Sequence, residues 1–286
     1  MIKYVVIGDP VSHSRSPGMQ NAAFEKLGMG RPYGRCHVTK ESLPEFFVMA
    51  KKKLSGVNIT VPHKENILPF PDEIDPIAAL CRSVNTLDIR DGKVRGYSTD
   101  GYGLEQAVRK NFDIPPAGKT FCFIGCGGAC RASAIHLAAE GAGKIFLVNR
   151  TVEKAADIAR IIAENFPACQ VHFFAPQEKK ELESAIASSD VLIQSTSLGL
   201  KEEDPAPFDL TLLEANKKIA VFDTIYKNTK LLQEAAKLHL PCAGGRDMLI
   251  YQGAASFRLW TGMEPDIAAM NAGFDITPVT DGDGKE

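Results

Sequence analysis

The feature that most constrains this chain is a glycine-rich turn between a predicted strand and a predicted helix. Residues 119–125 (KTFCFIG) are rich in β-forming side chains and end in glycine, and 131–141 has helical character. The turn between them consists of Gly125, Cys126, Gly127, Gly128 and Ala129. Glycine lets a pyrophosphate approach the backbone, and the N–H groups that open a helix attract phosphate. This order predicts a dinucleotide site, with a purely structural turn as the alternative.

The residues that follow the next predicted strand bear on the choice of dinucleotide. The strand 144–148 (KIFLV) leads into Asn149, Arg150 and Thr151, and Lys154 lies one helical turn further on. NAD sites usually place a carboxylate here, where it accepts a hydrogen bond from the ribose 2′-hydroxyl. No carboxylate is present to repel a 2′-phosphate, and a guanidinium binds phosphate in a bidentate fork. We therefore expect NADP, with a solvated surface role for Arg150 as the alternative.

Strands and helices alternate along the rest of the chain. After residue 150, helices are predicted at 152–165 and 182–187, and strands at 171–174, 191–194 and 219–223. The first hundred residues repeat the alternation, with strands at 4–7 and 56–60 and a helix at 17–27 between them. Alternation of this kind is typical of an α/β fold with a parallel sheet covered by helices. We expect two α/β domains that join near residue 102, followed by helices within 248–272 and a polar tail.

Composition excludes several classes of protein. Of 286 residues, 44% are hydrophobic and 24% are charged, and the net charge is −2, so neither disorder nor nucleic-acid binding is indicated. No apolar run is long enough for a membrane span, and the N-terminus lacks the pattern of a signal peptide. The seven cysteines are an odd number without zinc-site spacing, which favours a reducing, cytoplasmic setting. We expect Cys122, Cys126 and Cys130 to be small buried residues and expect no metal.

Polar residues gather in the first half of the chain without an obvious structural purpose. Ser14 and Ser16 precede Pro17, where their hydroxyls suit either a carboxylate ligand or a simple helix cap. Lys64 follows an apolar strand, although lysine is seldom buried, and a plain surface residue is the alternative. Asp100 precedes a predicted helix and is either a functional carboxylate or a turn residue.

Taken in chain order, a set of short segments makes the chain resemble the shikimate dehydrogenase family. These segments are HSRSP, GVNITVPHK, SVNTL, STDGYG, GCGGA, NRT, TSLG and GRDMLIYQ, and they extend over residues 3–262. Members of that family reduce 3-dehydroshikimate to shikimate with NADPH, and some oxidise quinate. The resemblance implies a substrate domain at 1–102 and a Rossmann-type domain at 103–247. It also implies helices at 248–275 that return to the first domain, before a flexible tail at 276–286.

The resemblance also implies roles for individual residues. It implies that Lys64 and Asp100 are the catalytic pair, in which Lys64 donates a proton to the developing alkoxide or stabilises its charge. The substrate contacts that it implies come from Ser14, Ser16, Thr60, Asn85, Gln252 and Tyr226. The cofactor contacts that it implies come from Gly125, Gly127, Gly128, Ala129, Asn149, Arg150, Thr151, Lys154 and Gly245.

Several positions depart from the family pattern and keep alternatives open. Arg82, Ser83 and Ser98 replace the usual residues on the substrate side, and the loop after Tyr226 is short. A quinate or quinate/shikimate dehydrogenase therefore stays an alternative, because a pocket built for one hydroxyl pattern rejects others. A non-catalytic regulator on the same fold is disfavoured because Lys64 and Asp100 are both present. The expected partner is a small-molecule substrate, without nucleic acid or membrane, and the chain is either a monomer or a homodimer.

Overall fold

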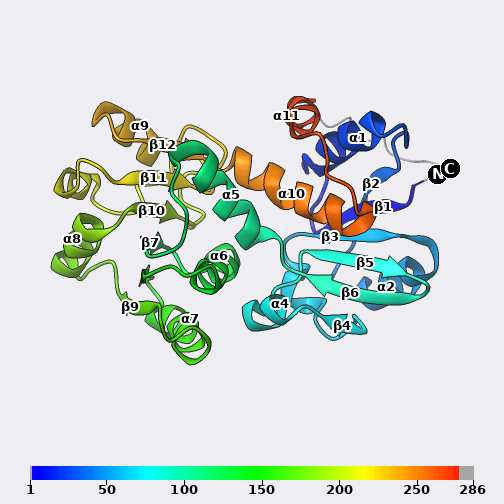
Figure 1. Cartoon of the computed structure of the whole chain (residues 1–286), viewed down its shortest axis with the longest axis horizontal. Helices are drawn as coiled ribbons and strands as arrows, with labels where there is room; N and C mark the ends of the chain where they lie inside the picture. Colours follow the sequence, from blue (N-terminus) through cyan, green and yellow to red (C-terminus); the bar gives the residue numbers. More distant parts are fainter. Residues whose placement is uncertain (1, 277–286) are drawn as a thin grey trace. The chain divides into compact units, whose positions relative to one another are not determined.

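A computed structural model describes residues 2–276 of the chain (Figure 1). Contacts divide the chain into two compact units, Met1–Thr99 with Ile250–Glu286 and Asp100–Leu249. Of the predicted tail at 276–286, only Ile276 lies within the described residues. No described helix is both long and apolar enough to cross a membrane.

The first unit is built on a six-stranded sheet with the strand order β2-β1-β3-β5-β6-β4. Its strands are β1 (Tyr4–Gly8), β2 (Tyr33–His37), β3 (Gly56–Ile59), β4 (Glu73–Ile74), β5 (Thr86–Arg90) and β6 (Lys93–Tyr97). Its helices are α1 (Ser16–Lys26), α2 (Leu43–Lys53), α3 (His63–Asn66), α4 (Pro76–Cys81), most of α10 (Arg246–Thr261) and α11 (Ile267–Asp275). Strands β2, β1 and β3 are parallel, so their carboxyl ends meet at one edge of the sheet.

This sheet is mixed, which the alternating pattern did not predict. Strand β5 pairs antiparallel with β3 and with β6. A turn at Asp91 and Gly92, both with positive φ, joins β5 to β6. A two-residue turn of this kind is the usual link of a hairpin, because its twist matches that of the strands.

The two faces of the first sheet bury different chemistry. Side chains alternate along a strand, so Val57 and Ile59 of β3 enter an apolar cluster with residues of α2 and α4. Asn58, between them, faces α10, where its amide donates to the hydroxyl of Ser256 at 3.0 Å. Trp260, further along α10, donates from Nε1 to the carbonyl of Leu87 at 2.9 Å. This second face therefore holds a buried polar layer beneath α10.

The second unit has a fully parallel sheet in the order β12-β11-β10-β7-β8-β9. Its strands are β7 (Thr120–Ile124), β8 (Lys144–Val148), β9 (Gln170–Phe174), β10 (Val191–Gln194), β11 (Ala220–Asp223) and β12 (Cys242–Gly244). Its helices are α5 (Asp100–Phe112), α6 (Gly128–Ala139), α7 (Val152–Asn165), α8 (Lys179–Ser188), the short η1 (Leu210–Ala215) and α9 (Lys230–Lys237). The chain order reverses between β7 and β10, and dinucleotides bind at such a switch point.

The predicted α/β class and Rossmann-type order are confirmed in this unit. Each strand predicted after residue 119 is present, and β12 is an addition that the sequence reading missed. Cys122, Cys126 and Cys130 are buried and free, as expected of small residues within a strand, a turn and a helix. Residues of α8, η1 and α9 pack on one face of the sheet around Cys122 and Leu192.

Candidate functional site

A cavity of about 370 Å³ lies at the carboxyl ends of β7, β8 and β10 in the second unit. Gly125, Gly127, Asn149, Arg150, Thr151 and Lys154 line it, and all six are residues predicted to bind the cofactor. Gly128 and Ala129 form the first turn of α6 beside it. Gly245 is not part of the lining; a Cβ atom on it would lie 2.0 Å from the carbonyl oxygen of Thr224. A glycine is therefore needed at position 245 for packing against Thr224.

The glycine turn leaves room for a ligand above the start of α6. Gly125 has φ of +97°, and a Cβ atom there would lie 2.5 Å from Cγ2 of Thr196, so only glycine suits both backbone and space. A Cβ atom on Gly127 or Gly128 would meet no atom within 4 Å. The backbone N–H groups at the beginning of α6 therefore border open space, which is the arrangement that binds phosphate at a helix N-terminus.

Asn149 ties the glycine turn to the basic loop that follows β8. Its Oδ1 accepts a hydrogen bond from the backbone N–H of Cys126 at 3.0 Å, and its Nδ2 donates to the carbonyl of Thr151 at 2.8 Å. The side chains of Arg150 and Lys154 are exposed at the rim. None of the residues described as lining the cavity is a carboxylate, so the wall carries positive charge only. These residues fit the 2′-phosphate of NADP.

The loop Ser195–Leu198 forms another wall of this cavity, and the sequence reading assigned it no site residue. Fully buried Gln194 organises it, because its Nε2 donates to Leu198 O at 2.9 Å and its Oε1 accepts from the N–H of Thr196. Gln194 also reaches the carboxylate of Asp223, which accepts from Ile225 N at 2.9 Å and Thr229 Oγ1 at 2.7 Å. Burial raises the pKa of the Asp223 carboxyl. The TSLG motif was the available signal for this loop.

In the first unit, the two predicted carboxylate-binding serines lie at the start of α1. Ser14 Oγ accepts a hydrogen bond from the N–H of Ser16 at 3.3 Å, so its hydroxyl hydrogen is not used in that contact. Tyr33 donates its hydroxyl hydrogen to Asn58 Oδ1 at 2.7 Å. Burial raises the pKa of Tyr33 well above its usual range, and a side-chain hydrogen bond with Ser16 opposes that shift. Ser16 is thus connected to the polar layer beneath α10.

The predicted substrate residues Asn85 and Gln252 meet directly within the first unit. Asn85 Nδ2 lies 3.2 Å from Gln252 Oε1 and 2.8 Å from Thr99 Oγ1, and Asn85 Oδ1 accepts from the N–H of Thr99 at 2.9 Å. Both amide side chains are buried. This cluster fixes the backbone of Thr99, the residue that precedes Asp100 in the chain.

Thr60 and Lys64 occupy the turn that follows β3. The N–H of Thr60 donates to the carbonyl of Ile7 at 2.9 Å, and the carbonyl of Lys64 accepts from Val84 N at 2.9 Å. Lys64 lies in the short helix α3 and is partly buried. The structure therefore places it in a turn beyond the strand, hydrogen-bonded through its carbonyl to Val84, the residue that precedes Asn85.

Asp100 belongs to the second unit, where it is the first residue of α5 and is buried. The next residue, Gly101, lies against α6, since a Cβ atom there would be 2.8 Å from Ala132 O. Further along α5, Glu105 Oε2 lies 2.8 Å from His136 Nε2 of α6. This close packing fixes Asp100 relative to the helix that opens at the glycine turn. Tyr226 also lies in this unit and is 47% exposed.

A grouping of possible metal ligands occurs in the second unit that the sequence reading did not anticipate. Ligand atoms of Glu105, His136 and Glu140 all lie within 4.8 Å of one another. Glu105 also accepts from Arg109 Nε at 2.8 Å, and the hydrogen bond with His136 lowers the pKa of the Glu105 carboxyl. These contacts give Glu105 and His136 a structural role, because a hydrogen bond joins them between α5 and α6 and Glu105 pairs with Arg109 within α5.

Comparison with known proteins places this geometry in context. Three family models match the chain: "Shikimate dehydrogenase substrate binding domain" at residues 6–87, "Shikimate / quinate 5-dehydrogenase" at 106–200 and "Shikimate 5'-dehydrogenase C-terminal domain" at 245–272. A curated relative from Bacillus cereus, named shikimate dehydrogenase (NADP(+)), is 39% identical over 274 residues, which are 93% of this chain and 95% of the relative.

Solved structures show the same architecture. Shikimate 5-dehydrogenase from Thermus thermophilus, in complex with NADP(H) and shikimate, has a TM-score of 0.83 and 31% identity over 96% of this chain and 98% of that one. Quinate dehydrogenase from Corynebacterium glutamicum, in complex with NAD, has a TM-score of 0.84 and 27% identity over 96% of this chain and 98% of that one.

Proposed function

Because the chain belongs to the shikimate dehydrogenase family, we propose that it catalyses the reversible, NADP-linked interconversion of shikimate and 3-dehydroshikimate. The family's curated members of this name match over almost the whole chain, and both predicted catalytic residues are present. The enzyme is therefore an oxidoreductase that acts on a CH–OH group.

The observation that carries the proposal is the buried amide and hydroxyl cluster of the first unit. Asn85, Thr99 and Gln252 form it, next to the turn that bears Lys64. A ring with several hydroxyl groups needs donors and acceptors held at fixed positions, since an unmatched buried polar group is costly. With Ser14, Ser16 and Thr60, this cluster supplies the ligands that a hydroxylated cyclohexene carboxylate requires. Tyr226, on the exposed loop after β11, is proposed as a further substrate contact.

The residues of the second unit fit NADP. Phosphate groups would lie on the N–H groups at Gly127, Gly128 and Ala129, and Arg150 with Thr151 and Lys154 would hold the 2′-phosphate. When bound, NADPH supplies the hydride for reduction of the ring carbonyl. The protein must then supply a proton to the carbonyl oxygen.

We assign that proton transfer to Lys64. In the direction of reduction its ammonium group gives a proton to the oxygen as the carbonyl becomes an alcohol, and in oxidation the neutral amine takes the proton back. Asp100, as an acceptor, orients the reacting hydroxyl and the ammonium group. Both groups act on the same substrate oxygen in this scheme.

Quinate is the second candidate substrate. A quinate dehydrogenase shares this fold at 27% identity, and Ser98 and Arg82 depart from the usual residues beside the substrate segments. We also propose a cytoplasmic location, in keeping with seven free cysteines, and a monomer or homodimer as the assembly.

The test compares K64A, K64R and D100N with the wild type in shikimate oxidation by NADP. K64A and D100N are expected to lower kcat by about 100- to 10,000-fold, the usual effect of removing a positioned acid or base, with thermal stability unchanged. K64R keeps the positive charge but holds its proton too tightly to transfer it, so it should resemble K64A. Activity of folded K64A near the wild-type level would refute the assignment. An active K64R would show that Lys64 acts through its charge alone.

A further inference from the structure

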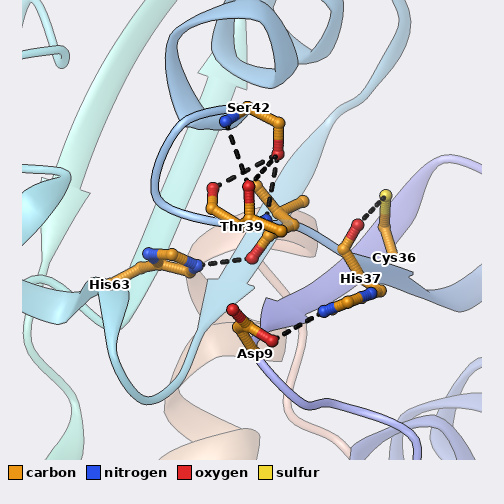
Figure 2. A network of polar contacts seen from close by, with 7 residues as sticks. Asp9, Cys36, His37, Thr39, Ser42 and His63 are labelled. Atoms are coloured by element: carbon orange, nitrogen blue, oxygen red, sulfur yellow. Dashed lines mark hydrogen bonds and ion pairs between the residues drawn. The ribbon is translucent and has the colours of Figure 1, made fainter.

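His63 is a fully buried residue that directly precedes Lys64 and has no part in the scheme above. Its Nε2 lies 2.6 Å from the carbonyl oxygen of Val38, and Figure 2 shows the ring directed at the backbone between His37 and Thr39. Because a carbonyl only accepts hydrogen bonds, Nε2 carries the hydrogen and donates it. The other ring nitrogen, Nδ1, is buried and has no hydrogen-bond partner among the described residues.

The turn from Thr60 to Lys64 rests on the carboxyl edge of the first sheet. Backbone contacts hold it there, since Asp9 N donates to Val61 O at 3.1 Å and His63 N donates to Thr60 O at 2.9 Å. The bond from the His63 ring to Val38 differs from these because a side chain makes it. It links the turn that follows β3 to the segment that follows β2, and β1 lies between these strands in the sheet.

The segment that carries the acceptor is itself well ordered. Thr39 N donates to Ser42 Oγ at 2.9 Å, and Ser42 N donates to Thr39 Oγ1 at 3.3 Å, so each residue closes the turn for the other (Figure 2). Val38 is 2% exposed, and its N–H donates to the carbonyl of Gly8. The ring of His63 is therefore anchored to a fixed carbonyl, not to a loose loop.

The unsatisfied nitrogen shows that filling space is not the whole role of this ring. A buried polar atom without a partner costs about 1–3 kcal/mol, which an apolar side chain of similar volume would not incur. The His63 ring nevertheless makes one short hydrogen bond, to the carbonyl of Val38, and His63 is the chain neighbour of Lys64. We propose that His63 is a positioning residue that holds the α3 turn, and with it the Lys64 ammonium group, at the substrate. This inference rests on the proposed role of Lys64.

The experiment measures kcat, KM for shikimate and KM for NADP in H63L and H63Q, beside K64A. Leucine keeps much of the volume without a donor, whereas the glutamine amide supplies an N–H of similar reach. H63L should lose about 10- to 100-fold in kcat, the cost of a misplacement near 1 Å, with KM for NADP unchanged. H63Q should recover most of that loss. The pH profile of kcat should shift in H63L and return in H63Q, which a purely structural role would not produce.

Two results would overturn the inference: folded H63L with the wild-type kcat, or H63Q as impaired as H63L. If H63L does not fold, S42A tests the same link with a smaller perturbation. It removes the hydrogen-bond acceptor of Thr39 N, in the peptide group that carries the Val38 carbonyl, and the Ser42 side chain makes no capping bond to α2 that would be lost. S42A should lower kcat severalfold and leave KM for NADP unchanged; an unaltered kcat would count against the inference. Normal activity of K64A would instead refute the proposed catalytic role, so the two failures are distinguishable.

Discussion

Gly101, the residue after Asp100, is a position where a single methyl group should harm catalysis without touching a predicted catalytic residue. An alanine Cβ there would lie 2.8 Å from Ala132 O and 2.4 Å from His136 Cβ, whereas ordinary contact begins at 3.4 Å. The start of α5 would have to retreat by about 0.6 Å from the carbonyl and about 1.0 Å from His136. The Glu105–His136 bond, 2.8 Å long, opposes that retreat further along the helix.

Two effects of opposite sign decide the stability of G101A. Alanine is favoured over glycine in a helix interior by up to about 1 kcal/mol, but residue 101 is only the second residue of α5. Overpacking costs about 1–3 kcal/mol, so a net loss is expected. Because Asp100 moves with the start of the helix, kcat should fall by about 10- to 100-fold.

The assay combines steady-state kinetics with shikimate and NADP and urea unfolding at neutral pH. G34A is the matched control, because a Cβ on Gly34 would meet its nearest neighbour, Ile2, at 3.5 Å, an ordinary contact. It should leave kcat unchanged. If G101A kept both the stability and the kcat of the wild type, the argument that α5 packing positions Asp100 would be wrong.

Three further predictions concern the second unit. R150Q should raise KM for NADP by about 10- to 100-fold, the value of one or two charge-assisted hydrogen bonds, and leave KM for NAD nearly unchanged; equal changes for both would exclude a 2′-phosphate contact. Q194L should raise KM for NADP about 10-fold because Thr196 N and Leu198 O lose their partner, with KM for shikimate as the unaffected control. The hydrogen bond with His136 lowers the pKa of the Glu105 carboxyl below its ordinary 4.5. The ionised carboxylate therefore stabilises the folded protein fully above pH 4.5, and this contribution is lost as the pH falls through the depressed pKa. Urea unfolding should show E105Q less stable by about 1.5–3 kcal/mol at pH 7, with the deficit shrinking below pH 4.5; a constant deficit would contradict this.

Local sequence was sufficient to identify residues that line one cavity at the carboxyl ends of β7, β8 and β10. The strand, the glycine turn and the basic loop are contiguous, and each needs only short-range chemistry to be recognised. The dual bonding of Asn149 and the support of the Ser195–Leu198 loop by Gln194 were not predicted. The bond from Cys126 N to Asn149 joins segments that are 23 residues apart in the chain, so no spacing rule reports it. The bonds of Gln194 to Thr196 and Leu198 are local, but they depend on how the loop after β10 turns, which periodicity does not show.

The first unit was harder to predict for the same reason. The hairpin between β5 and β6 had a local signal, Asp91 followed by Gly92, that was not used and would have indicated antiparallel pairing. The contact of Asn85 with Gln252 spans 167 residues, and that of His63 with Val38 depends on the placement of β1 between two other strands. Such partners follow from the assembled sheet and are invisible to periodicity.

The measurement that tests the account most directly is the initial rate of nicotinamide reduction with shikimate and with quinate, each paired with NADP and with NAD. Shikimate with NADP is expected to give the dominant kcat/KM. A dominant rate with quinate, or with NAD, would contradict the proposed substrate or the role of Arg150. Absence of turnover with every pair would contradict the proposed function itself.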